Sequence, residues 1–183
     1  MFGLPLHPLV VHAVIVLVPA AVIGSVLVAV WPRVRARWAW PVVALTAMAT
    51  LAIPVATSTG EGLERNIPRT PSIQAHVELG DQLLVFVAAM LVCVAALVAL
   101  DRMRRRRTAD ATLAAHRAGP GTMAAPRIRD GQAQVAALVL AVLTVGFALV
   151  SAVQVVRIGD SGARAAWGSL QYAPQPWPVG RDG

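Results

Sequence analysis

Residues 9–30 form an apolar run without a single charged residue. As a helix, at about 1.5 Å per residue, this run would reach roughly 33 Å, and the hydrocarbon core of a bilayer is about 30 Å thick. Pro8 precedes the run and suits a first helical turn, where its missing N–H costs little. Met1–Pro8 contains no basic residue, and the run is long for a secretory signal, so we predict a retained membrane-spanning helix.

The composition also indicates a membrane protein. Of the 183 residues, 57% are hydrophobic and 14% are charged, with a mean hydropathy of +0.65, whereas soluble domains carry about 25% charged residues. The net charge of +7 comes from sixteen basic residues, all arginine, and most of these flank apolar runs as topology determinants do. We therefore expect the lipid bilayer as a partner and no nucleic acid. The single cysteine, Cys93, permits no internal disulfide and is interpreted as a packing residue.

Four apolar segments predict four transmembrane helices, over about residues 8–30, 39–57, 75–100 and 134–156. Residues 32–37 are predicted to be a short basic loop, flanked by tryptophans of an interfacial belt. Residues 101–130 are predicted to be a basic cytoplasmic loop, and the Pro-rich tail, 169–183, is expected to be loosely ordered. The fold class expected for residues 1–168 is all-α, an integral membrane four-helix up-down bundle.

The distribution of arginines predicts the orientation. Eleven arginines fall in the two connections after the first and third helices, and five fall on the other side of the bundle. By the positive-inside rule, the two basic connections lie in the cytoplasm and both termini lie outside. We expect a multi-pass membrane protein with this orientation. The run Arg104–Arg107 is interpreted as a stop-transfer signal, with recognition of an anionic lipid as the alternative.

The predicted topology brings many ionisable side chains to the outer end of the bundle. They come from four segments but share one depth: His7, His12, Glu61, Glu64, His76, Glu78, Asp81, Arg157 and Asp160. Histidine inside a membrane helix is costly unless it faces protein, water or a ligand. Threonines 46, 50 and 57 on the second helix and Thr144, Ser151 and Gln154 on the fourth are expected to face the bundle interior.

Three short motifs resemble one known family. They are Leu6-His7-Pro8-Leu9-Val10-Val11-His12, His76-x-x-x-Gly80-Asp81 and Gly159-x-Ser161-Gly162-Ala163. Over roughly residues 1–168 the chain resembles the domain-of-unknown-function 2231 family of bacterial predicted membrane proteins. The resemblance implies four membrane helices and no established activity. In the family a histidine often stands where this chain has Asp160, and this departure weakens the carry-over of a ligand role to the fourth helix.

We weigh three functions for the outer cluster, and the pattern does not decide whether the protein is an enzyme. In the first, His12 and His76 form interhelical hydrogen bonds in a structural or interaction protein, beside a membrane protein partner or in a homo-oligomer. In the second, the protein is redox-associated and binds haem or a metal ion. The candidate cofactor-binding residues are then His7, His12 and His76, and the candidate metal ligands are His12, His76, Asp81 and Asp160.

The third function is that of a small transporter or accessory subunit, which we expect to need polar residues along the whole bundle. Hydrolase chemistry is rejected, because Ser161 lacks the Gly-x-Ser-x-Gly pattern of a strand–turn–helix nucleophile. In a square bundle the first and third helices are diagonal, so His12 and His76 are predicted to converge on one site across the core. Gly80, one turn beyond His76, is predicted to lie at a close contact with a neighbouring helix.

Overall fold

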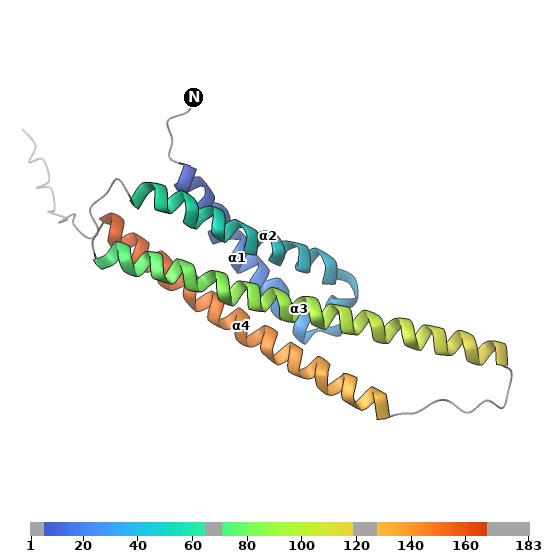
Figure 1. Ribbon diagram of the computed structural model, residues 1–183. Helices are drawn as coiled ribbons and strands as arrows, with labels where there is room; N and C mark the ends of the chain where they lie inside the picture. The colour runs from blue at the N-terminus through green and yellow to red at the C-terminus, as the bar shows by residue number, and fades with distance from the viewer. Residues whose placement is uncertain (1–5, 65–70, 119–127, 168–183) are drawn as a thin grey trace, which may run out of the picture.

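The protein is a bundle of four long helices. The computed structural model describes residues 6–64, 71–118 and 128–167, and these residues contain α-helices and no strand. The helices are α1 (Leu6–Val30), α2 (Pro32–Glu64), α3 (Pro71–Ala118) and α4 (Ile128–Trp167). Figure 1 shows that consecutive helices run in opposite directions. The predicted all-α up-down four-helix bundle is confirmed.

Each helix is long and apolar enough to cross a membrane. The candidate spans are Leu9–Val30, Pro32–Glu61, Ile73–Arg117 and Gly131–Arg164, all at least as long as the ~20 residues that a bilayer requires. Large apolar side chains such as Val16, Val92 and Leu138 are exposed on the outside of the bundle. An apolar exterior of this extent suits contact with lipid rather than with water.

Two predicted loops are helical instead. Residues 32–37 form the first turns of α2, and Pro32 occupies the first helical position, where proline is favoured. The prediction of a loop there is wrong, because arginine and alanine are good helix formers even where no apolar pattern guides them. Of the predicted loop 101–130, residues 101–118 continue α3, and an ion pair of 2.7 Å between Asp101 and Arg105, one turn apart, supports that extension. Residues 128–130 of the predicted loop begin α4, whereas residues 119–127 and the predicted tail 169–183 lie outside the described residues.

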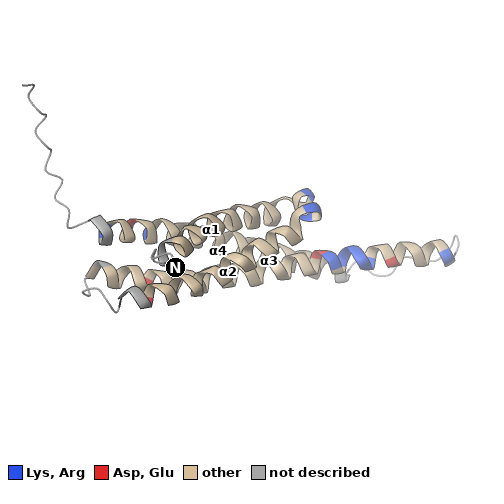
Figure 2. Cartoon of the chain, turned by 90° about the horizontal axis from the view of Figure 1, so that it is seen from above, with Lys and Arg blue, Asp and Glu red and all other residues tan. Residues whose placement is uncertain are grey.

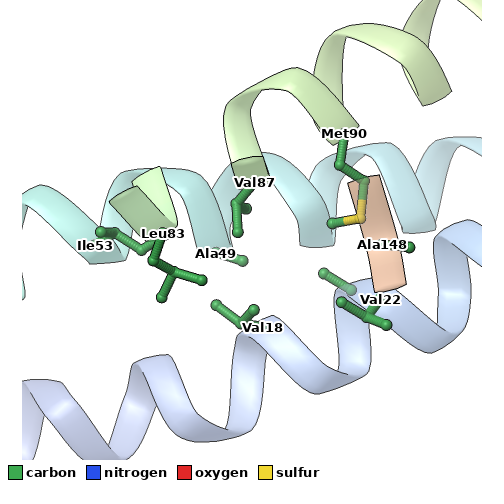
Figure 3. Close-up of a cluster of buried hydrophobic side chains, with 9 residues drawn as sticks. Val18, Val22, Ala49, Ile53, Leu83, Val87, Met90 and Ala148 are labelled. Carbon is green, nitrogen blue, oxygen red and sulfur yellow. The ribbon is translucent and has the colours of Figure 1, made fainter. Parts of the chain in front are cut away.

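All four helices contribute to one apolar core. Figure 3 shows Val18 and Val22 of α1 opposite Leu83, Val87 and Met90 of α3. Ala21 of α1, Ala49 and Ile53 of α2 and Ala148 of α4 complete this cluster, and all of its members are buried. Small and branched side chains let the four backbones pack around a common centre, which fixes the rotation of each helix about its axis.

The helices form a square in which α1 and α3 are diagonal partners. Each of them packs extensively on α2 and on α4, whereas α1 and α3 touch only slightly. On the α1–α2 side, a Cβ added at Gly24 would lie 3.1 Å from Cγ2 of Val42, so the two backbones approach closely there. Next to that contact, the hydroxyls of Ser25 and Thr46 are hydrogen-bonded at 3.3 Å, and both are buried.

Candidate functional site

The two ends of the bundle differ in charge. Figure 2 shows most of the arginines gathered at the α1–α2 connection and along the α3 extension, with a few acidic residues among them, while the other acidic residues lie at the opposite end together with a few arginines. We call the first of these the arginine end. The opposite end, where α1 and α3 begin and α2 and α4 finish, carries the predicted cluster of histidines and acids; we call it the histidine end.

At the histidine end, His76 joins α3 to α4. Its Nδ1 atom lies 3.1 Å from Oγ of Ser161, a residue 85 positions further along the chain. The imidazole also lies against Gly162, because a Cβ added to that glycine would be 3.1 Å from Cε1 and 3.3 Å from Nδ1 of the ring. A glycine at this position therefore makes room for the ring, and the adjacent serine holds it by a hydrogen bond.

The hydrogen bonds of Ser161 indicate which group donates in its contact with His76. The Ser161 hydroxyl donates to the carbonyl of Ile158 at 3.0 Å. A hydroxyl has one proton to donate, so its oxygen is the acceptor in the contact with His76. Nδ1 of His76 then carries a proton and donates a hydrogen bond to Oγ of Ser161.

A second polar contact joins the same two helices deeper in the bundle. Nε2 of Gln154 donates to Oε1 of Gln82 at 2.9 Å, and the Gln154 side chain is only 4% exposed. Among the described residues, Oε1 of Gln154 and Oγ of Ser151 are buried without a hydrogen-bond partner. Thr144, Ser151 and Gln154 are all buried, so their predicted inward orientation is confirmed, as it is for buried Thr46.

The other predicted site residues are more open. His12 is exposed, as are Glu61, Glu78 and Asp81. Asp160 is exposed too and is paired with Arg164, one turn away, at 2.8 Å. The side chains of His7 and Glu64 lie outside the described part of the chain.

No group of three or more histidine, cysteine, aspartate or glutamate side chains placed to hold a metal ion occurs among the described residues. The ligand roles of His7, His12, His76, Asp81 and Asp160 therefore remain predictions.

The close contact predicted at Gly80 is a loose one. Gly80 faces α2, but a Cβ placed there would lie 3.9 Å from Cγ2 of Thr57, an ordinary van der Waals distance. The glycines that allow tight approach are Gly24, against Val42, and Gly162, against His76. The prediction for Gly80 came from its position one helical turn after His76. The His76 ring instead contacts α4, and which glycine it meets depends on the rotation of α3 and α4 about their axes.

Sequence reasoning missed Ser161 and Gly162 as partners of His76. Both belong to the glycine-rich motif at the end of α4, and His76 belongs to the motif at the start of α3. The signal that could have found them is that both motifs fall at the same end of an up-down bundle. Histidine, serine and glycine together form an interhelical contact with hydrogen bonding and close packing.

Fold and site define a class: a four-helix protein with membrane-spanning helices and a histidine contact between two of them. A family model described as predicted membrane protein (DUF2231) matches residues 3–170, and the chain belongs to this family. No curated protein and no solved structure matches the chain.

Proposed function

We propose that the protein is a structural or interaction component of a bacterial cytoplasmic membrane, with both termini outside and the arginine end in the cytoplasm. The observation that carries this proposal is the contact of His76 with Ser161 and Gly162, which ties the start of α3 to the end of α4. Hydrogen bonds and small residues are the means by which membrane helices associate, because lipid provides no hydrophobic drive between them.

The histidine end also offers exposed groups to a partner. His12, Glu61, Glu78 and Asp81 are exposed there, on three different helices held by the common core. An imidazole and several carboxylates on a rigid scaffold suit polar contacts with another membrane protein or a second copy of this chain.

A second candidate is a redox-associated protein that binds haem or a metal ion through His12 and His76. The observation that favours it is the contact of His76 Nδ1 with Ser161, since metal-ligating histidines commonly hold one ring nitrogen on a hydrogen-bond partner. The transporter alternative has less support, because the buried polar side chains of the described helices are hydroxyls and one glutamine, without a charged group: Ser25, Thr46, Thr144, Ser151 and Gln154.

The structural role is tested by a double-mutant cycle on His76→Ala and Ser161→Ala, measured as thermal unfolding of the full chain in detergent. Each single variant should lose about 0.5–2 kcal/mol, and the double variant should resemble the worse single one, since both remove one interhelical contact. As a matched control, His116→Ala, at an exposed site on α3, should add independently to Ser161→Ala. Additive losses for His76 and Ser161 would contradict a shared contact.

The same preparations distinguish the redox candidate. An absorption spectrum and elemental analysis of the purified protein should show no Soret band and no stoichiometric metal if the role is structural. A Soret band, or one metal ion per chain, that disappears in both His12→Ala and His76→Ala would place the redox candidate first. Spectrally silent, additive substitutions at the two histidines would show that they share no site under either proposal.

A further inference from the structure

A pocket at the arginine end is distinct from the histidine contact. It has a volume of about 260 Å³ and lies between the first turns of α2 and the part of α3 that leads into its extension. Its charged and aromatic lining consists of Arg35, Arg37, Trp40, Asp101, Arg102 and Arg105. Since one water occupies about 30 Å³ of liquid, the pocket has room for a larger group.

The pocket lining is strongly positive. Four arginines and one aspartate line the pocket, which leaves a net charge of three positive units. The Asp101 carboxylate is already bound to Nε of Arg105 at 2.7 Å. Arg35, Arg37 and Arg102 therefore converge without a second carboxylate in the lining to neutralise them, and a bound anion would relieve their mutual repulsion.

Arg35 supplies a donor that lacks an acceptor. Its Nε atom is buried and has no hydrogen-bond partner among the residues that the structure describes. A guanidinium is always charged and has five N–H donors in a planar fork, so a buried unpaired N–H is costly. The planar fork matches the oxygens of a phosphate group and can bind two of them at once.

Two further features favour an anion here. The guanidinium carbon of Arg102 lies 4.8 Å from the centre of the Trp40 ring, and this cation–π contact holds that side chain beside the pocket. Arg35 and Arg37 also belong to the first two turns of α2, which begins at Pro32. The N-terminus of a helix carries a partial positive charge, which attracts phosphate groups.

The depth of the pocket points to a lipid. Trp31 and Trp38, close to it in sequence, are exposed, and exposed tryptophans mark the level of the lipid headgroups. We propose that this pocket binds a phosphate group, and that the group belongs to the headgroup of an anionic phospholipid. The arginines would then do more than stop translocation: Arg35 and Arg102 would hold one lipid against the α2–α3 junction.

The test is native mass spectrometry of the full chain in a neutral detergent, titrated with phosphatidylglycerol or with phosphatidylcholine. Phosphatidylglycerol should occupy one saturable site and phosphatidylcholine should bind at least several-fold more weakly. Arg35→Gln and Arg102→Gln should each weaken binding of phosphatidylglycerol roughly tenfold, the loss expected for a hydrogen bond to a charged group. Arg33→Gln and Arg106→Gln, which remove the same charge outside the pocket lining, should change it less than about twofold.

Inorganic phosphate separates the two sources of the group. If the site recognises a phospholipid headgroup, millimolar phosphate should compete with phosphatidylglycerol. Phosphate binding that the lipid does not displace would overturn the lipid assignment.

Three outcomes would overturn the site itself. Equal losses of lipid affinity in the pocket variants and their controls would show a diffuse field of arginines instead of a site. Equal affinity for the two lipids, or the absence of saturable binding, would also contradict it. Arg35→Lys keeps the positive charge but not the planar guanidinium, so it should lose less affinity for phosphatidylglycerol than Arg35→Gln does. If Arg35→Gln fails to fold, Arg35→Lys replaces it in the comparison with the controls.

Discussion

At the scale of single residues, Gly162 is one of two described glycines, with Gly24, at which an added side chain would meet a neighbouring helix at 3.1 Å. The His76 ring lies over it, and the ring is held in place by Ser161 at 3.1 Å, so it cannot move aside without losing that bond. We predict that Gly162→Leu destabilises the bundle by about 1–3 kcal/mol, as overpacking does elsewhere.

Gly159 provides the matched control for Gly162. It lies three residues earlier on the same helix, is exposed, and a Cβ there would have no atom within 4 Å among its described neighbours. Gly159→Leu should leave the midpoint of thermal unfolding in detergent unchanged or raise it slightly, because leucine favours a helix more than glycine does. Equal effects of the two substitutions on the midpoint would show that the ring does not restrict Gly162.

At the scale of the elements, the hydrogen bond between Gln82 and Gln154 joins α3 to α4 within the spans. Gln82→Leu removes the acceptor for Nε2 of Gln154 and leaves an amide that is only 4% exposed without this partner. We predict a loss of about 1–2 kcal/mol from an unpaired buried polar group. The double variant Gln82→Leu/Gln154→Leu should recover most of this stability, since it removes both polar groups together.

The measurement for the glutamine pair is again thermal unfolding in detergent. Gln74→Leu, at an exposed glutamine near the start of the same helix α3, is the control and should be close to neutral. A double variant less stable than Gln82→Leu would mean that the Gln154 amide stabilises the bundle through other contacts.

At the scale of the whole molecule, the orientation in the membrane rests on the split of eleven arginines against five. We predict that an impermeant thiol reagent added to intact cells labels Glu61→Cys and Gln74→Cys, both exposed at the histidine end. It should fail to label Ala36→Cys and Ala115→Cys at the arginine end until the cells are opened. Cys93 is buried, and Cys93→Ala removes it from the background.

The reverse labelling pattern would contradict the proposed orientation in the membrane but not the four-helix fold. Labelling of Ala115→Cys in intact cells is the most sensitive outcome, because residues 101–118 extend α3 beyond the bundle in Figure 1. The arginines of residues 101–118 determine the orientation only if this segment stays on the cytoplasmic side while the helices insert.

The amino-acid sequence alone determined the number of helices, their approximate spans and the inward polar faces of α2 and α4. Hydrophobicity over about 20 residues is a local property, and lipid forces every such segment into a helix that satisfies its own backbone. The local nature of this signal also explains why the predictions of loops at residues 32–37 and 101–118 were wrong. There the polar composition suggested loops, but arginine and alanine continue the helices that the spans begin.

Only the tertiary structure decided which side chains meet. His76 of α3 contacts Ser161 and Gly162 of α4, whereas Gly80 makes no tight contact. At the other end of the bundle, Arg35 of α2 and Arg102 of α3 line the same pocket. These contacts depend on the rotation of each helix about its axis, which is set by packing of small and branched residues from all four helices around one core. Beyond its few polar positions, the sequence of a single helix does not determine that rotation, because in lipid the apolar faces of the helix are equally acceptable until a neighbour packs against one of them.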